Sequence, residues 1–265
     1  MGAYGLLGSM LSRRIEEIPL FNLHRIDHVE CDISFKDDIR CFVEKYQPEI
    51  IINCAAYTDV DGCEKNKDYA RSVNSEGVKN VAQVCERNGI WLVHVSSDAV
   101  FGDSKPHAES DRTCPCNYYG KTKDMGEKYL MDSMDNYFIV RTSSLFGPDG
   151  KNFVDTVNLS VKMGGVDVVN DQVTQPSYTK DVADGIVRLI EEEYGFGIYH
   201  IVNSGCASWY ELACETSSEE NFNPISSSEM KRDAKRPRLS YIENNKMREL
   251  RPWKNALRDY LYGSY

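Results

Sequence analysis

Trp91-Leu-Val-His-Val-Ser-Ser97-Asp98 decides the fold of this chain, because it joins an apolar strand to polar side chains at the strand's end. A second apolar run, Glu-Ile-Ile-Ile-Asn-Cys at 49–54, is rich in β-branched residues. Runs of this kind are typical of strands that are buried on both faces of a parallel sheet. The two runs therefore predict buried parallel strands, and the second delivers the Ser97 hydroxyl at its C-terminal end.

Strands and helices alternate along most of the chain. The apolar periodicity predicts strands at 19–23, 49–54, 90–95 and 137–140, and helices at 34–46, 67–88 and 117–134. Ser34 is the expected cap of the first helix, and Gly89 is expected to close the second. Units of this spacing predict an α/β fold with a Rossmann-like, doubly wound parallel sheet that binds ligands at the carboxyl ends of its strands.

After Gly147-Pro148-Asp149-Gly150 the alternation loosens. Helices are predicted near 152–163 and 179–194, short strands at 166–169 and 198–202, an exposed loop at 216–229 and a last helix from about Trp253. We therefore expect two units. Residues 1–147 with 178–200 form the cofactor-binding unit, and residues 148–177 with 201–265 form a smaller, discontinuous substrate-binding unit.

The helix predicted at 117–134 carries Tyr119 and Lys123, which are one turn apart on one face. A phenol beside a fixed cation can protonate a carbonyl oxygen, and Ser97 can hold that oxygen. Lowering a phenol pKa from about 10 to near 7 requires about 4 kcal/mol, whereas an exposed ion pair supplies only ~0–1 kcal/mol. The pair must therefore lie in a partly desolvated cleft, with a second positive charge such as an oxidised nicotinamide.

The alternative is a coincidence on a surface helix. With 16 tyrosines, roughly one Tyr-x-x-x-Lys pair is expected by chance. Tyr119 is the one tyrosine with a lysine at that offset, and the order of the surrounding elements favours the catalytic interpretation.

The chain opens on Gly2-Ala-Tyr-Gly5-Leu-Leu-Gly8. Glycines in this pattern let a backbone approach a pyrophosphate at a helix N-terminus. A strand should precede such a loop, but here Met1 alone does. We expect either that the natural product begins further upstream with an apolar, β-branched strand, or that the chain is a truncated copy.

Composition excludes several classes of function. The net charge of −10 argues against a nucleic-acid partner, and no apolar run reaches the length of a membrane span. The nine cysteines are odd in number and scattered, so we expect mostly reduced core thiols and a cytoplasmic protein. Cys114-Pro-Cys116 lacks a second cysteine pair, so the sequence predicts no metal site.

Further motifs carry a resemblance that covers essentially the whole chain. They are Gly2-x-x-Gly5-x-x-Gly8, Ile52-Asn-Cys-Ala-Ala-Tyr-Thr58, Asp61-Gly-Cys-Glu64, Val73-Asn74, Val95-Ser-Ser-Asp98-Ala-Val-Phe101, Pro106-His-Ala-Glu109-Ser-Asp111, Tyr119-Gly-Lys-Thr-Lys123 with Gly126-Glu127, Arg141-Thr142, Asn152-Phe153, Asp171-Gln172-x-x-x-Pro176-Ser177 and Arg236-Pro237. Together they resemble the dTDP-4-dehydrorhamnose reductases, which are extended short-chain dehydrogenases that act on nucleotide sugars.

The resemblance implies a role for each matching position. Ser97, Tyr119 and Lys123 would be the catalytic residues. The cofactor would be held by the residues that match the family's binding positions, namely Gly2, Gly5, Leu6, Leu7, Gly8, Asp32, Ile33, Ala55, Ala56, Tyr57, Tyr119 and Lys123. For Ala55 and Ala56, simple packing is the alternative.

Cofactor choice depends on the end of the second predicted strand. The segment Asn22-Leu-His24-Arg25 lacks the acidic residue that would hold a ribose 2′-hydroxyl. Arg25 can instead meet a 2′-phosphate, which favours NADPH and leaves NADH possible. The alternative is a solvated arginine.

Other positions depart from the family pattern. Ala99 stands where an aromatic residue is usual, His107 where a tyrosine is expected, and Ser144 where a tryptophan is common. These changes predict a roomier sugar pocket and leave the identity of the sugar open.

Three functional classes follow. The first is NAD(P)H-dependent reduction of a 4-keto nucleotide sugar, such as dTDP-4-dehydro-L-rhamnose to dTDP-L-rhamnose in polysaccharide precursor synthesis, by a possible homodimer. The second is a related epimerase or a reductase of another sugar. The third is a non-catalytic, cofactor-binding regulatory subunit.

Overall fold

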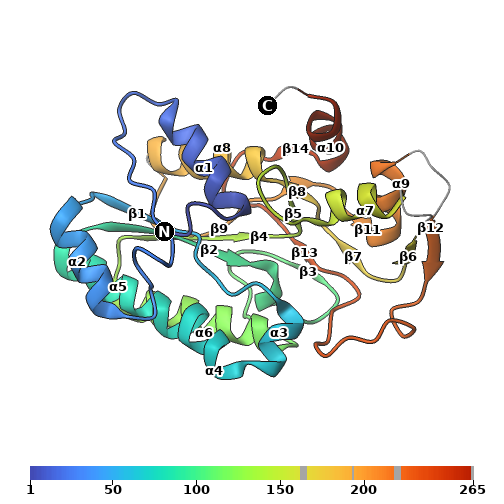
Figure 1. Cartoon of the computed structure of the whole chain (residues 1–265), viewed down its shortest axis with the longest axis horizontal. Helices are drawn as coiled ribbons and strands as arrows, with labels where there is room; N and C mark the ends of the chain where they lie inside the picture. The colour runs from blue at the N-terminus through green and yellow to red at the C-terminus, as the bar shows by residue number, and fades with distance from the viewer. Residues whose placement is uncertain (162–165, 193, 218–221, 264–265) are drawn as a thin grey trace.

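A four-stranded parallel sheet forms the centre of the molecule (Figure 1). The computed structural model of the protein describes residues 1–161, 166–192, 194–217 and 222–263. In space the strands follow the order β1 (Ile50–Asn53), β2 (Trp91–Ser97), β4 (Tyr137–Thr142) and β9 (Gly197–His200). The register pairs Ile52 with Val93, and Val95 with Val140. The predicted parallel α/β sheet is confirmed.

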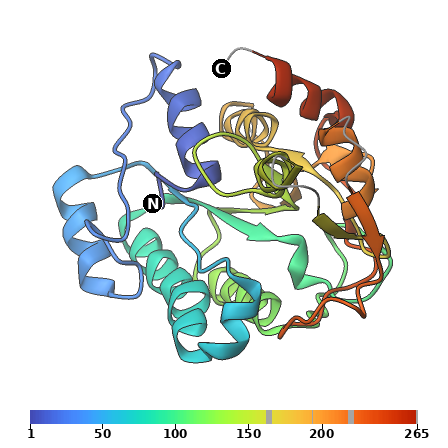
Figure 2. The same ribbon diagram turned by 45° about the vertical axis from the view of Figure 1, so that its right-hand side comes forward.

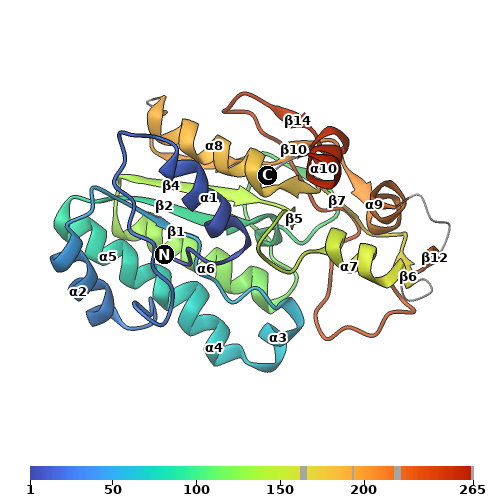
Figure 3. The ribbon, with the colours of Figure 1, turned by 45° about the horizontal axis from the view of Figure 1, so that its top comes forward.

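Helices cover both faces of this sheet (Figure 3). On one face lie α1 (Leu6–Glu16) and α8 (Thr179–Glu191), and on the other lie α2 (Lys36–Tyr46), α5 (Val78–Asn88) and α6 (Tyr118–Ser133). Successive residues of a strand point to opposite faces. Accordingly, Leu92 packs in the core beneath α5, whereas Val93 packs in the core beneath α8.

Apart from α3 (Val60–Lys65) and α4 (Lys67–Arg71), which lie against α6, the remaining elements gather beyond the carboxyl ends of the sheet strands (Figures 1 and 2). Helices α7 (Phe153–Val161), α9 (Trp209–Thr216) and α10 (Trp253–Tyr262) share a small core around Phe146, Tyr178 and Trp253. The short strand pairs are β5 (Leu145–Phe146) with β8 (Ser177–Tyr178), β6 (Val166–Val169) with β12 (Phe222–Ile225), β7 (Val173–Thr174) with β11 (Ala207–Ser208), β10 (Asn203–Ser204) with β14 (Leu250–Pro252), and β3 (Pro106–His107) with β13 (Tyr241–Ile242). The division into two units with the boundaries given above stays a prediction.

The helix expected at 67–88 is interrupted. It runs as α4 (Lys67–Arg71), a π-helical segment at Ser72–Gly77 and then α5. Inside the π segment the buried side chain of Asn74 accepts from Tyr57 N (2.8 Å) and donates to Tyr57 O (3.0 Å) and Thr122 Oγ1 (3.2 Å). Bulges of this type often mark functional sites, and this one fixes the loop that follows β1.

Two expectations about individual segments are wrong. Residues 19–23 form no strand, and part of the loop expected at 216–229 is β12, which pairs with β6. Residues 218–221 of that loop lie outside the described residues. A strand is stable only when a neighbour accepts its hydrogen bonds, and a cavity separates the 20–26 segment from the sheet.

That cavity lies along the outer edge of β1. Trp91 N donates to Glu49 O, so the backbone groups of Ile50 and Ile52 face away from β2. Met1 extends this edge, because its amine donates to Ile52 O (2.8 Å) and its carbonyl accepts from Cys54 N (3.0 Å). These two bonds follow the pattern of a parallel ladder. Met1 therefore pairs with the outer edge of β1 in the manner of a parallel strand residue.

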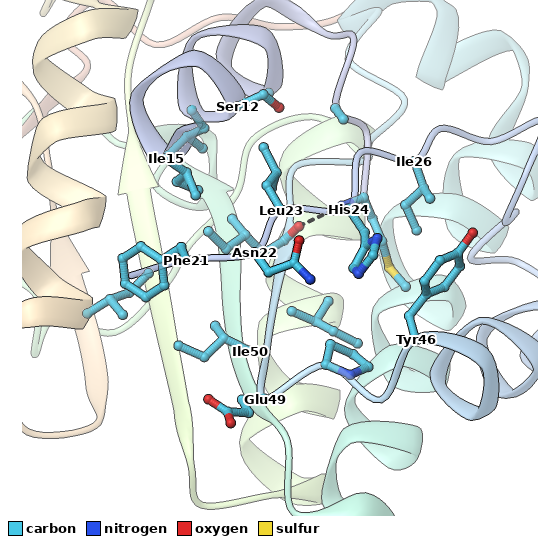
Figure 4. A pocket seen from close by; sticks show the side chains of 18 of the residues that line it. Ser12, Ile15, Phe21, Asn22, Leu23, His24, Ile26, Tyr46, Glu49 and Ile50 are labelled. Carbon is cyan, nitrogen blue, oxygen red and sulfur yellow. Dashed lines mark hydrogen bonds between the residues drawn. The ribbon is translucent and has the colours of Figure 1, made fainter. Parts of the chain in front are cut away.

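Next to Met1, toward the N-terminal end of β1, the outer edge of this strand borders a cavity of about 390 Å³. Figure 4 shows Ile15 of α1, Leu23 and Ile26 of the 20–26 segment, and Ile50 of β1 around it. The cavity thus has the position of a further parallel strand, and its lining combines these apolar side chains with polar ones such as Asn22 and His24. No described helix is long and apolar enough to span a bilayer.

Candidate active site

The first turn of α6 packs closely against the turn that follows β2. Asn117 caps the helix, because its side chain accepts from Gly120 N (2.8 Å). A side chain at Gly120 would collide with the carbonyl of Ala99. The glycine therefore lets the helix approach this turn closely, which places Tyr119 beside the end of β2.

Ser97 ends β2 and meets Tyr119 there. Its hydroxyl donates to Asp98 Oδ1 (2.9 Å) and accepts from Ala99 N (3.1 Å). The Tyr119 side chain lies close enough to this hydroxyl for Ser97 to influence the titration of the phenol. The sequence-predicted pair of hydroxyls is thus brought together at the carboxyl end of a central strand, where open α/β sheets bind their ligands.

Burial dominates the titration of Tyr119. It raises the pKa of the phenol to about 12, which is the opposite of the lowering that we expected from the sequence, while the Ser97 side chain acts to lower this pKa. The phenol therefore keeps its proton at neutral pH. This is the state that a proton donor to a carbonyl oxygen requires.

Lys123 lies one turn further along α6 and is 1% exposed. Its Nζ donates to Val95 O (2.8 Å) and lies 3.5 Å from His94 Nε2. Burial lowers the pKa of Lys123 to about 8, and Glu127 opposes that shift. Burial lowers the pKa of His94 as well, so this imidazole stays neutral beside the ammonium group.

A buried ion pair supports this arrangement. Both of its residues stand in the motifs quoted above, but nothing in the sequence indicated that they pair. Arg141 on β4 contacts both carboxylate oxygens of Glu127, at 2.7 Å from NH2 and at 3.0 and 3.2 Å from Nε. Ser96 Oγ donates to the same carboxylate (2.5 Å). Glu127 follows Tyr119 and Lys123 at the same spacing of four residues, which was the available signal for its role.

Asp98 is a second residue that stands in a quoted motif but had no predicted role. Besides Ser97, its carboxylate accepts from Ser143 Oγ (2.7 Å) and from Ser240 Oγ. It thereby joins the end of β2 to the segment after β4 and to the segment before β13. No signal in a single sequence indicates such a long-range contact.

The glycine loop fits a bound pyrophosphate. Gly5 precedes α1 without a side-chain cap, so the first backbone N–H groups of the helix, including those of Leu6 and Leu7, are available to an anion. Gly2 has a φ of +69°, and a side chain there would meet the backbone of Ala55. Gly8 packs against the carbonyl of Gly2.

The residues expected around the rest of the cofactor follow β1 and line the turn before α2. Ala55 N donates to Asn53 Oδ1 (3.1 Å), and Asn74 holds the backbone of Tyr57. Asp32 Oδ1 accepts from Ser34 N (2.8 Å). Ser34 does not cap α2, whose N-cap is Phe35.

Arg25 has a different partner from the one we expected. Its NH2 lies 2.5 Å from Glu16 Oε2, and its Nε is buried without a hydrogen-bond partner in the described part of the chain. Glu16 is the last residue of α1, about 15 Å along the helix from Leu6. The assignment of Arg25 to a 2′-phosphate therefore stays a prediction.

The three departures from the family pattern lie in different surroundings. Ala99 contacts the start of α6. Ser144, with a φ of +38°, hydrogen-bonds Thr174. His107 is 2% exposed and stacks on Phe101, with ring centroids 4.0 Å apart. Of the three, His107 is a core residue rather than an open pocket residue.

Cysteine burial differs from the expectation of mostly core thiols. Cys31, Cys63 and Cys85 are buried, whereas Cys41, Cys114, Cys206 and Cys214 are exposed.

Comparison with known proteins identifies the family. The model of the RmlD substrate binding domain matches residues 1–264. The chain belongs to this family. A dTDP-4-dehydrorhamnose reductase of Aggregatibacter actinomycetemcomitans is 34% identical over 97% of this chain and 96% of its own length. A probable dTDP-4,6-dihydroxy-2-methyloxan-3-one 4-ketoreductase of Streptomyces antibioticus is also 34% identical, over 97% of this chain and 92% of its own length.

A solved structure agrees with this assignment. The dTDP-4-dehydrorhamnose reductase of Bacillus anthracis, crystallised in complex with NADP, superposes with a TM-score of 0.94 at 34% identity. The superposition covers 99% of this chain and 97% of that protein. The RmlD relatives therefore share both the fold and the sequence pattern of this chain.

Proposed function

We propose that the protein is an NADPH-dependent oxidoreductase that reduces the 4-keto group of a nucleotide-linked 6-deoxy sugar. The observation that carries the proposal is that the Ser97 and Tyr119 side chains meet at the end of β2, with Lys123 buried one turn below. Relatives of about 34% identity are named as dTDP-4-keto sugar reductases, and one was crystallised with NADP.

Each catalytic residue has a distinct task in this mechanism. Tyr119 donates its proton to the carbonyl oxygen as negative charge develops there, and Ser97 donates a hydrogen bond to the same oxygen. When bound, the reduced nicotinamide supplies the hydride. Lys123 places a positive charge beneath the site and, through its bond to Val95 O, is fixed to the strand that carries Ser97.

The binding of the cofactor would extend from this site to the glycine loop. The uncapped start of α1 would hold the pyrophosphate, and Ala55, Ala56 and Tyr57 would lie along the nicotinamide half. Asp32 and Ile33 would meet the adenine. These are residues whose position and size fit the group.

The identity of the sugar is a narrower question. Relatives of nearly equal identity carry names for different 4-keto sugars. The 4-ketoreductase of Streptomyces antibioticus is 34% identical to this chain, and a dTDP-4-keto-6-deoxy-D-glucose reductase of Streptomyces niveus is 36% identical. We take dTDP-4-dehydro-L-rhamnose as the first substrate to test. We further expect the enzyme to act in the cytoplasm as a homodimer, which cell fractionation and sedimentation would measure.

The decisive assay follows the oxidation of NADPH in the presence of a panel of dTDP-4-keto-6-deoxy sugars. Turnover by the wild type and its loss in Tyr119→Phe support the proposal. Cofactor binding without turnover on every sugar would instead support a regulatory subunit. Interconversion of epimers without net oxidation of NADPH would support the epimerase.

A further inference from the structure

Three donor atoms of different chemistry meet in the loop between β2 and α6. They belong to Asp103, His107 and Cys114, and all lie within 4.8 Å of one another. His107 Nε2 lies 2.6 Å from Asp103 Oδ1, and Cys114 Sγ lies 2.9 Å from the same oxygen. We propose that these three residues form a binding site for a transition-metal dication, with zinc as the ion that best fits the donor set.

The two contacts of the His107 ring are the first argument. Both ring nitrogens face carboxylates, since Nδ1 lies 3.1 Å from Asp111 Oδ2 while Nε2 faces Asp103. A neutral imidazole has one N–H group, so it can donate to only one of these oxygens. When that group donates to Asp111, the lone pair of Nε2 faces Asp103 and Cys114, so nitrogen, oxygen and sulfur donors converge on one point.

Asp111 gives the imidazole the orientation of a metal ligand. In metal sites a ligating histidine commonly donates its second N–H to a carboxylate, which fixes the ring and leaves the other nitrogen facing the ion. Here Asp111 takes the position of that carboxylate. The ring is held further by stacking on Phe101 and by the pairing of β3 with β13.

The other two donors have the freedom that binding requires. Cys114 is anchored by its backbone, because Cys114 N donates to Val100 O (2.9 Å), while its side chain is exposed. The Asp103 side chain is 46% exposed. Donors of a tetrahedral zinc ion lie about 3.3–3.6 Å apart, as follows from bonds of about 2.0–2.3 Å. A movement of Asp103 alone lengthens the contacts of its Oδ1 with His107 Nε2 and Cys114 Sγ. A water molecule can supply the fourth ligand.

The site differs from the cysteine pair that the sequence presented. Cys116 Sγ lies 3.7 Å from Lys235 O and does not belong to the cluster. Binding would deprotonate the Cys114 thiol and form one metal–sulfur, one metal–nitrogen and one metal–oxygen bond. Because Cys114 precedes Tyr119 by five residues, a bound ion would fix the loop that leads into the catalytic helix.

Cobalt(II) is the probe for the test, because a thiolate bound to it gives a charge-transfer absorption. Titrating the reduced, metal-free full chain with cobalt chloride should show one equivalent bound with this band, and zinc chloride should displace it. Cys114→Ser should remove the band and weaken binding at least tenfold. The matched variant Cys116→Ser should retain both. Asp111→Asn should weaken binding about 10–100-fold, as a lost outer carboxylate does.

Three outcomes would overturn the proposal. They are no uptake of cobalt by the reduced protein, a band that survives in Cys114→Ser, and equal loss in Cys114→Ser and Cys116→Ser. Circular dichroism of every variant separates loss of the site from loss of the fold. Tyr119→Phe should bind cobalt like the wild type, because the cluster contains no catalytic residue.

Discussion

The two halves of the proposed cofactor site are built in different ways. The catalytic half lies on β2, β4 and α6; β2 and β4 are paired on both sides, and Lys123 and Glu127 have the buried partners His94 and Arg141. The adenosine half adjoins β1, whose outer edge is paired at Met1 and then borders a cavity. Strand pairing thus holds the catalytic residues more firmly than the residues that would bind the adenosine. Substitutions in the two halves should therefore differ in the size of their effect and in whether turnover, stability or cofactor affinity changes.

The largest effect is expected from Tyr119→Phe in the catalytic half. The substitution keeps the ring and removes the proton donor, so kcat should fall by about 10²–10⁴, equivalent to ~3–5 kcal/mol. The Kd for NADPH should stay nearly unchanged. Steady-state kinetics with a cofactor titration measure both. If turnover persists within a few fold of wild type, Tyr119 is not the donor.

Lys123→Met is the companion variant. It should reduce turnover and also weaken NADPH binding, because the side chain serves both. A surface-helix coincidence predicts no change in either variant.

Arg141→Met should have an effect of nearly the same size in kcal/mol, but on the free energy of unfolding instead of on turnover. It leaves the Glu127 carboxylate buried without its guanidinium, and breaking such a pair typically costs about 3–5 kcal/mol. Denaturant unfolding measures the change. Arg40→Met is the matched control, because Arg40 pairs with Asp37 on the surface at 3.2 Å, where such pairs contribute ~0–1 kcal/mol. Equal losses in the two variants would mean that burial of the Arg141 pair is not the cause.

The sequence predicted the residues whose positions depend on local periodicity, and it missed the contacts between separate elements. Ser97, Tyr119 and Lys123 could be placed together because strand ends and helix faces obey local periodicity. Glu127 with Arg141, and Asp98 with Ser240, could not be paired, because those contacts depend on how separate elements pack. The strand expected at 19–23 had the right apolar pattern, but its formation depends on a neighbouring strand. Arg25 was assigned from its position alone, and the structure places it against Glu16.

The adenosine half should be strengthened by adding a strand. Fusing an apolar, β-branched segment such as Lys-Ile-Val-Val-Ile directly before Met1 should fill the cavity and pair with the outward backbone groups of Ile50 and Ile52. Two or three new hydrogen bonds at about 0.5–1.5 kcal/mol each should raise the free energy of unfolding by roughly 1–4.5 kcal/mol. For a domain of this size Tm should rise by about 2–4 °C per kcal/mol.

An equally long Gly-Ser segment before Met1 is the control, since it offers the same chain length without apolar side chains. Thermal unfolding of the two fusions gives the comparison. NADPH affinity should improve only in the apolar fusion, because the strand leads directly into the Gly2–Gly8 loop. If both fusions behave like the parent chain, the cavity does not accept a strand.

The smallest effect is expected from Arg25→Ala. In the structure Glu16 competes for the guanidinium, and the pair is partly exposed. A 2′-phosphate that takes over Arg25 must replace this ion pair, so the net gain is about 0.2–1 kcal/mol, or less than about fivefold in the Kd for NADPH. Binding of NADH should not change.

Glu16→Gln is the informative counterpart, because it frees Arg25 without removing it and should tighten NADPH binding by a similar factor. Titrating both cofactors against both variants measures this, and equal changes for NADPH and NADH would remove Arg25 from the 2′-phosphate role. In that case the preference for NADPH has to come from other groups around the turn that contains Asp32 and Ile33.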